Sequence, residues 1–282
     1  MNAPAIVRTV AELRQVVTAW RLAGDRVALV PTMGALHAGH MSLVELARAK
    51  ARRVATSIFV NPTQFAPHED FAKYPRTFET DVEKLAQAGC DLVFAPLPRE
   101  MYPEGFATTI SLEGPATAGL EDSVRPAHFA GVATIVAKLL IQAAPDAVVL
   151  GEKDFQQLAV VARMARDLDL PVEIVGAPTM READGLAMSS RNVYLSPAER
   201  TAAPVLNRVL KVSAARIKRG EPIEMVMEEG GSEITRAGFA LDYLEARHAL
   251  TLKPINSVKD GPIRLLVAAK IGKTRLIDNL AV

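Results

Sequence analysis

The sequence is poor in cysteine, and this limits the chemistry that it can support. Cys90 is the only cysteine among 282 residues, so an intramolecular disulfide and a cysteine-rich zinc site are both excluded. A single thiol fits a protein of a reducing compartment. Cys90 opens the apolar stretch CDLVFAP, and a free cysteine in such a stretch is typically a core residue.

An excess of charge and long apolar runs are absent as well. The 33 Lys and Arg residues are balanced by 32 Asp and Glu residues, so no extended nucleic-acid or membrane surface is indicated. No stretch approaches the roughly 18 apolar residues that span a bilayer. The stretch MNAPAIVRTVAELRQVV lacks the apolar centre of a signal peptide. We therefore expect a soluble, cytoplasmic protein that binds any anionic ligand through a few local charges.

Short apolar runs alternate with helical patterns through the first two thirds of the chain. The runs are RVALVPT, VATSIFV, DLVFAP, DAVVLG and VEIVGAP. Apolar residues at spacings of three and four predict helices over Ala11–Trp20, Met41–Ala51, Phe78–Ala88, Val132–Ile141 and Phe155–Ala165. Strands that are apolar throughout are buried on both faces, so this pattern predicts a doubly wound α/β domain with a parallel sheet between helices.

The pattern changes beyond Met180. Two long helices are expected over Pro197–Lys218 and Pro222–Ala237, each followed by a glycine stop. Two strand-like runs, LDYLEARHAL and IRLLVAAKIG, follow, and their alternation predicts a small antiparallel sheet. We therefore divide the chain into a domain of residues 1–180 and a smaller α+β domain of residues 181–282.

Polar segments follow four of the five predicted parallel strands. They are TMGALHAGH, NPTQF, GEKDFQQ and PTMREADGLAMSSRN. Because ligands of such sheets bind beyond the carboxyl ends of the strands, we expect these segments to converge on one edge.

His37 and His40 lie where the first of these strands turns into a helix. If the helix begins near Ala38, both rings face the point off its N-terminus where backbone N–H groups and the helix dipole favour an anion. Gly34 and Gly39 allow a close approach of the backbone. The pattern favours a phosphate site over two alternatives, a buried hydrogen-bond network and a metal site, since further metal ligands are lacking nearby.

The segment GEKDFQQ adds a cation and two amides. Lys153 follows its strand directly and can reach the phosphates of a nucleotide, but Lys153 and Asp154 taken alone are more typical of a surface ion pair with a helix cap. Gln157 lies three residues into the helix and is expected to point toward the strand ends.

Three further strings are weak when taken alone. MSSRN, from Met188 to Asn192, offers two hydroxyls and a guanidinium to phosphate oxygens. NPTQF and RPAHF supply amides, Arg125 and His128. Asn61 before Pro62 could be turn chemistry, whereas Gln64 has no evident structural need.

Together the motifs resemble those of the pantothenate synthetase family, the pantoate:β-alanine ligases. PTMGALHAGH, SIFVNPTQF, YPRTFETD, RPAHFAGV, GEKDFQQL and READGLAMSSRNVYLS match that family in its order, from Pro31 to Ser196. HAGH matches the HxGH signature of the wider nucleotidyltransferase superfamily. The resemblance implies a Rossmann-like N-terminal domain, a smaller C-terminal lid domain and a homodimer. It implies that pantoate and MgATP give pantoyl adenylate and pyrophosphate, and that β-alanine then gives pantothenate and AMP.

The resemblance also implies roles for individual residues. His40, His37, Lys153 and Arg191 would be catalytic. ATP would be bound by Met33, Gly34, Ala35, Leu36, His37, Ala38, Gly39, His40, Gly151, Glu152, Lys153, Asp154, Met180, Met188, Ser189, Ser190 and Arg191. The substrates would be bound by Gln64, Gln157 and Asn61, with Arg125 and His128 in a loop near the entrance. Mg²⁺ would lie mainly on phosphate oxygens, with Asp81 as a weakly supported contact.

Two other functions remain open at this point. HxGH is shared with nucleotidyltransferases of coenzyme A or NAD synthesis, which act on a phosphate ester. Such a substrate would call for a further basic patch where the chain has Gln64 and Gln157. A nucleotide sensor without catalysis is the other alternative, and full activity of a His40→Ala variant would favour it.

Overall fold

The computed structural model describes residues 3–65, 71 and 74–282. The chain forms two compact units. One consists of Met1–Glu152 and Gln157–Pro178, and the other of Lys153–Gln156 and Thr179–Val282. The short segment Lys153–Gln156 therefore belongs to the second unit, although its neighbours in sequence belong to the first.

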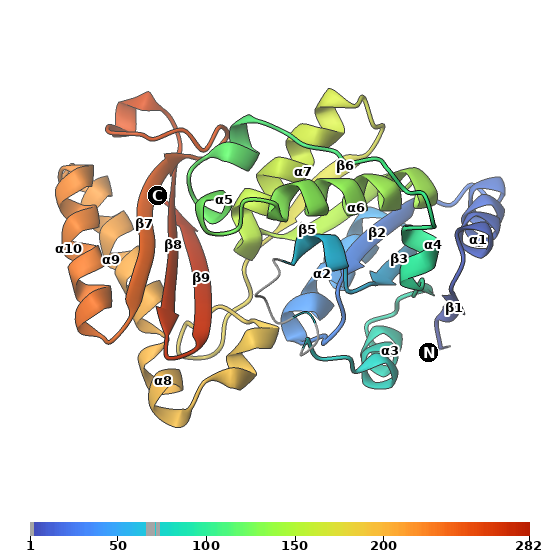
Figure 1. Ribbon diagram of the computed structural model, residues 1–282, viewed down its shortest axis with the longest axis horizontal. Coiled ribbons are helices and arrows are strands. Elements are labelled where there is room, and N and C mark those ends of the chain that lie inside the picture. The colour runs from blue at the N-terminus through green and yellow to red at the C-terminus, as the bar shows by residue number, and fades with distance from the viewer. Residues whose placement is uncertain (1–2, 66–70, 72–73) are drawn as a thin grey trace. The chain divides into compact units, whose positions relative to one another are not determined.

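The first unit is built on a six-stranded sheet in the order β1-β4-β3-β2-β5-β6, and every pairing in it is parallel (Figure 1). The strands are β1 (Ala5–Val7), β2 (Val27–Thr32), β3 (Arg53–Ile58), β4 (Leu92–Phe94), β5 (Ala147–Gly151) and β6 (Glu173–Ala177). The five predicted strands are confirmed as β2 to β6. The three-residue β1 was not predicted, since it is too short to produce an alternating pattern.

Helices cover both faces of this sheet. They are α1 (Val10–Leu22), α2 (Ala38–Lys50), α3 (Phe78–Gln87), α4 (Pro98–Met101), α5 (Glu121–Val124), α6 (His128–Ala143) and α7 (Phe155–Asp167). Short 3-10 turns are η1 (Pro62–Gln64), η3 (Gly114–Thr117) and η4 (Glu152–Asp154). The five predicted helices are confirmed as α1, α2, α3, α6 and α7.

Alternation along β2 explains why the unit has two apolar cores. Val27 and Leu29 pack in one cluster with residues of α1, α6 and α7, whereas Ala28 and Val30 pack in another with residues of α2 and α3. Successive side chains of a strand point to opposite faces, so a strand that is apolar throughout feeds both cores. The doubly wound α/β fold expected from the sequence is confirmed. Cys90 is buried in the second cluster, as predicted.

The strand order places β2 and β5 side by side where the direction of winding reverses. β3 and β4 continue from β2 on one side, and β6 continues from β5 on the other. Loops that leave two such strands diverge and open a crevice at the carboxyl end of the sheet. The segments that begin at Met33 and at Glu152 leave from these two strand ends.

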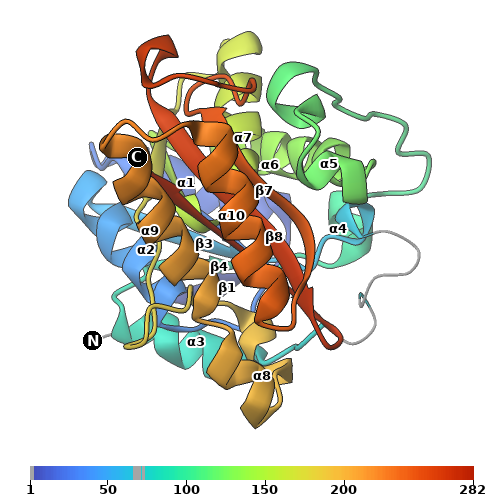
Figure 2. The same ribbon diagram turned by 90° about the vertical axis from the view of Figure 1, so that its left-hand side faces the viewer.

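The second unit contains a three-stranded antiparallel sheet in the order β7-β8-β9. Its elements are η5 (Ser190–Tyr194), α8 (Pro197–Ala202), α9 (Val205–Lys218), α10 (Ile223–Arg236), β7 (Ala240–His248), η6 (Val258–Asp260), β8 (Ile263–Ile271) and β9 (Thr274–Ala281). The helices α9 and α10 lie along one face of this sheet, as both views show (Figure 1 and Figure 2).

Two expectations for this unit were wrong in detail. The single helix expected over Pro197–Lys218 is divided into α8 and α9, because Pro204 lacks a backbone N–H and stands at the N-cap of α9. The sheet has three strands rather than two, since β9 was missed. Its buried Asp278 and Asn279 break the apolar alternation that reveals a strand.

Candidate active site

The turn after β2 is held by a buried carboxylate. Gly34 and Ala35 both have left-handed backbone angles, with φ of 83° and 52°. The Asp81 side chain of α3 is fully buried and accepts hydrogen bonds from the backbone N–H groups of Ala35 (2.9 Å) and Leu36 (2.8 Å). The Thr77 hydroxyl donates a third bond to Asp81 at 3.1 Å. The strained turn is therefore fixed by charge-assisted bonds from a neighbouring helix.

These contacts give Asp81 a structural role. A protein-bound Mg²⁺ ion usually keeps several water or phosphate ligands. A carboxylate that binds it must therefore be open to water and to the nucleotide. The Asp81 carboxylate is enclosed, and both of its oxygens accept hydrogen bonds from the chain. In the part of the chain that the structure describes, no group of three or more His, Cys, Asp and Glu side chains could hold a metal ion. Asp81 therefore does not fit a metal site, and the described residues offer no protein cage for Mg²⁺.

His37 and His40 form a reciprocal cap at the start of α2. The Nδ1 atom of His37 accepts a hydrogen bond from the Gly39 N–H, and the Nδ1 atom of His40 accepts one from the His37 N–H, each at 3.2 Å. The two ring centroids lie 4.1 Å apart. Helix α2 begins at Ala38, three residues before the predicted start at Met41, so the condition set for the two histidines is met.

The cap also fixes the tautomer of both rings. Because each Nδ1 accepts a hydrogen bond, the proton of each neutral imidazole lies on Nε2. Both Nε2 atoms are therefore donors, on rings carried by the N-cap and the first turn of a 13-residue helix whose dipole is positive at this end. This arrangement favours an anion over a metal cation, since a metal would need a nitrogen lone pair.

Asn61 and Gln64 lie at the end of β3 and are joined to each other and to the turn after β2. Asn61 is 1% exposed, and its amide nitrogen donates to the Gln64 side-chain oxygen (3.1 Å) and to the Gly131 carbonyl (3.2 Å). The Gln64 amide nitrogen lies 2.9 Å from the Met33 sulfur. The hydrogen bond from Asn61 thus orients the Gln64 side chain, and Gln64 is the more accessible of these two residues.

Tyr102 completes this chain of contacts, and sequence reasoning missed it. Its hydroxyl donates a 2.7 Å hydrogen bond to the Asn61 side-chain oxygen. A phenol is protonated at neutral pH and burial raises the pKa of Tyr102 further, so its hydroxyl is available as a donor. Tyr102 lies in the irregular segment after α4, where no periodic pattern or motif marks it.

Arg125 and His128 hold the backbone at Gln64. His128 Nδ1 lies 2.9 Å from the Gln64 carbonyl oxygen, and the Arg125 guanidinium donates to the same oxygen at 3.2 Å. Arg125 also contacts His128 Nε2 at 3.2 Å. A carbonyl only accepts and a guanidinium only donates, so the neutral His128 ring carries its proton on Nδ1. The RPAHF motif therefore supports the Gln64 segment.

Gln157 lies in the first turn of α7 and is half-buried. It belongs to the first unit, as do Asn61 and Gln64. Its expected contact with a substrate remains a prediction.

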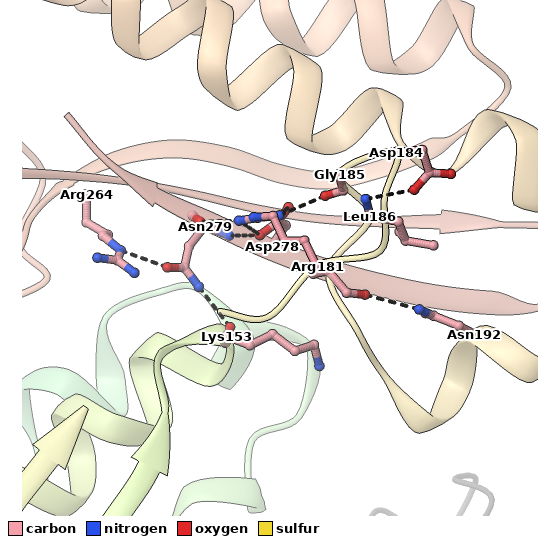
Figure 3. Close-up of polar contacts among 10 residues, drawn as sticks. Lys153, Arg181, Asp184, Gly185, Leu186, Asn192, Arg264, Asp278 and Asn279 are labelled. Atoms are coloured by element: carbon pink, nitrogen blue, oxygen red, sulfur yellow. Dashed lines mark hydrogen bonds and ion pairs between the residues drawn. The ribbon is translucent and has the colours of Figure 1, made fainter. Parts of the chain in front are cut away.

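Lys153 and Asp154 belong to the second unit. Gly151 ends β5 and Glu152 begins η4, so the pair follows the strand as the sequence predicted. The Lys153 ammonium lies 3.6 Å from the Asp154 carboxylate. The backbone carbonyl of Lys153 accepts a 2.8 Å hydrogen bond from the Asn279 side chain on β9 (Figure 3).

The segment from Met180 to Arg191 folds back on itself in the second unit. The Met188 N–H donates to the Met180 carbonyl at 2.9 Å, and Arg181 and Ala187 form an antiparallel bridge. The Ser189 hydroxyl caps η5 by accepting from the Arg191 N–H at 3.2 Å. The structure thus joins Met180 to Met188 and Ser189 to Arg191, with Ser190 as the first residue of η5.

The described helices include none that is long and apolar enough to cross a membrane.

Comparisons with known proteins point to one family. The model of the pantoate-beta-alanine ligase family matches residues 5–281. A pantothenate synthetase of Rhodopseudomonas palustris (strain HaA2) is 60% identical over 279 residues, which cover 99% of each chain. The crystal structure of pantothenate synthetase from Thermus thermophilus has a TM-score of 0.92 at 49% identity and 98% coverage of both chains. The pantoate-beta-alanine ligase of Francisella tularensis, complexed with beta-gamma ATP and beta-alanine, has a TM-score of 0.82 at 32% identity, covering 99% of this chain and 98% of that one.

Proposed function

The chain belongs to the pantoate–β-alanine ligase family, and from this premise we propose that it condenses pantoate with β-alanine through a pantoyl-adenylate intermediate. ATP is the co-substrate, and pantothenate, AMP and pyrophosphate are the products. The observation that carries the proposal is the pair of Nε2 donors that the His37–His40 cap presents at the start of α2. The family match favours this ligation over the alternative, nucleotidyl transfer to a phosphate ester.

The proposed ATP contacts lie in both units and are assigned separately for each. The first unit contributes Met33, Gly34, Ala35, Leu36, His37, Ala38, Gly39, His40, Gly151 and Glu152. The second unit contributes Lys153, Asp154, Met180, Met188, Ser189, Ser190 and Arg191. The solved relative that is complexed with beta-gamma ATP and beta-alanine supports ATP as the nucleotide.

The first step is attack of the pantoate carboxylate on the α-phosphorus of ATP. A carboxylate is ionised at neutral pH, so this step requires no general base. The C–O–P bond forms as the bond to pyrophosphate breaks, and negative charge grows on the α-phosphate and the leaving group. His37, His40, Lys153 and Arg191 are proposed as donors that stabilise this charge.

The second step is attack of the neutral β-alanine amine on the acyl carbon of the adenylate. The amide bond forms and AMP leaves with the electron pair of the broken C–O bond. The nitrogen, which is positively charged after the attack, loses one proton to solvent. Gln64 and Gln157 are proposed to bind pantoate through hydrogen bonds to its hydroxyl and carboxylate oxygens, and Asn61 to orient Gln64. Neutral amides discriminate for a substrate hydroxyl without trapping the carboxylate in an ion pair.

Mg²⁺ is proposed only as the counter-ion carried by the nucleotide phosphates. The described residues offer no metal cage, so no protein ligand and no step are assigned to it. A homodimer and a cytoplasmic location also remain proposals.

The proposal is tested by product analysis with the purified chain. Pantoate, β-alanine and ATP are expected to give pantothenate and AMP in equal amounts. Omission of either pantoate or β-alanine should stop pantothenate formation. ADP and phosphate in place of AMP and pyrophosphate would contradict the adenylate route.

A further inference from the structure

Asn279 connects β9 to the Lys153 segment (Figure 3). Its amide nitrogen donates a 2.8 Å hydrogen bond to the Lys153 carbonyl, and its amide oxygen accepts a 2.7 Å bond from Arg264 Nε. Asn279 is 2% exposed. From this geometry we propose that Asn279 is a positioning residue that holds Lys153 in place for nucleotide binding. The inference rests on the proposed contact between Lys153 and the phosphates of ATP.

The direction of the Asn279 amide follows from the chemistry of its two partners. A guanidinium can only donate, and a carbonyl can only accept. The amide oxygen must therefore face Arg264, and the amide nitrogen must face Lys153. Because the amide is buried with both partners supplied by the chain, a rotated amide would lose both bonds at once.

A second contact holds the same segment at Phe155, two residues after Lys153. The Arg264 guanidinium lies over the Phe155 ring, 4.2 Å from its centroid. Arg264 thus contacts Phe155 by cation–π attraction and Asn279 by a hydrogen bond. The two contacts tie the backbone from Lys153 to Phe155 to β8 and β9, which explains why this segment belongs to the second unit.

The neighbouring residue on β9 holds the other proposed nucleotide segment. Asp278 is 4% exposed and forms a two-pronged ion pair with Arg181, at 2.6 and 2.9 Å. Arg181 also donates to the Gly185 carbonyl at 3.1 Å. Asp278 and Asn279 are consecutive residues of β9. They therefore anchor the two segments of the second unit, around Arg181 and Lys153, to which ATP contacts are assigned.

Lys153 extends toward its proposed phosphate contact from the backbone that Asn279 holds. Its ammonium ends a flexible four-carbon chain, so a fixed backbone limits the positions that the charge can reach. Asn279 itself is not proposed to contact the nucleotide. Loss of its hydrogen bond to Lys153 is therefore expected to weaken ATP binding only through Lys153.

The test uses Asn279→Asp in the full-length protein. The carboxylate keeps the shape of the side chain and the acceptor for Arg264, but it places an oxygen against the Lys153 carbonyl oxygen. We expect the dissociation constant for ATP, measured by calorimetry, to rise about tenfold. Asn279→Ala removes the contact without adding charge and is expected to act in the same direction. Arg275→Ala is the matched control, since Arg275 lies on β9 but pairs with Asp242 at 2.6 Å, and it should leave ATP binding unchanged.

A double-mutant cycle with Lys153→Ala separates positioning from general damage. If Asn279 acts through the Lys153 side chain, Asn279→Asp should change ATP binding little in the Lys153→Ala background. An equal loss in both backgrounds, or no loss from either Asn279 variant, would overturn the inference. A failure of the proposed function looks different, because the wild-type chain would then not bind ATP or Lys153→Ala would bind it normally.

Discussion

The hydroxyl of Tyr102 donates a 2.7 Å hydrogen bond to the side-chain oxygen of the buried Asn61. This bond turns the Asn61 amide nitrogen toward Gln64, whose side-chain oxygen it reaches at 3.1 Å. Tyr102, for which the sequence predicted no role, thus sets the direction of the Asn61 amide. That amide holds Gln64, the residue proposed to bind pantoate.

Tyr102→Phe tests this relationship with the loss of a single oxygen atom. Asn61 keeps a 3.0 Å hydrogen bond from the Thr63 hydroxyl, so its oxygen is not left without a donor. We expect the KM for pantoate to rise about fivefold, the equivalent of one hydrogen bond of about 1 kcal/mol. The KM for ATP should be unchanged. Steady-state kinetics with each substrate varied in turn would check this, and an equal rise in both KM values would argue against a specific effect on Gln64.

His37→Asn separates the two roles of His37. Asparagine is a strong N-cap residue and can accept the Gly39 N–H in place of Nδ1, but it lacks the Nε2 donor. We expect the melting temperature to stay near that of the wild type. Because one donor to the transition state is lost, kcat should fall by two to three orders of magnitude, or about 3 to 4 kcal/mol. Near-normal activity in a stable variant would remove His37 from the proposed phosphate site.

Asp81→Asn tests the structural role of the buried carboxylate. One oxygen becomes an NH2 group, which must face the N–H of Ala35 or Leu36 or the hydroxyl of Thr77. We expect the free energy of unfolding to fall by about 2 to 3 kcal/mol, since a buried donor loses its acceptor. Urea denaturation measures this change.

The same variant distinguishes a metal ligand from a backbone anchor. A metal ligand would raise the Mg²⁺ concentration required for half-maximal activity and leave stability nearly unchanged. We expect the opposite, with the Mg²⁺ requirement retained in the fraction of the protein that remains folded.

Cys90 provides a test of the core and its pH dependence. Burial raises the pKa of the Cys90 thiol, so the folded protein keeps the thiol protonated where an unfolded chain has begun to ionise. The associated stability is fully present below the unfolded pKa of about 8.5 and is lost as the pH rises from there toward the folded pKa. A thiol reagent at pH 8 should label Cys90 only after unfolding in urea. Rapid labelling of the native protein would show that the core around Cys90 opens readily.

Much of the first unit could be predicted because its information is local. The run VALV feeds both cores from a single strand, and the apolar spacing from Met41 to Ala51 marks the helix that follows, although α2 begins three residues earlier at Ala38. Such patterns depend on residues that are close in sequence, and the two periodicities of strand and helix make them readable.

The supporting contacts could not be predicted, for a physical reason. Asp81 acts on backbone N–H groups 45 and 46 residues away, and every residue except proline has such a group, so no residue type marks the partner. Asn279 likewise binds a carbonyl 126 residues away. Strand β9 was missed for the same reason. Its buried polar residues resemble those of a surface loop, and their partners are distant in the sequence.

The most direct test of the central claim is the exchange of labelled pyrophosphate into ATP in the absence of β-alanine. If pantoyl adenylate forms reversibly at the His37–His40 site, label should enter ATP when pantoate is present and not when it is omitted. The His37→Asn variant should slow this exchange to the same extent as it slows the whole reaction. An active chain that makes pantothenate but shows no pantoate-dependent exchange would contradict the account.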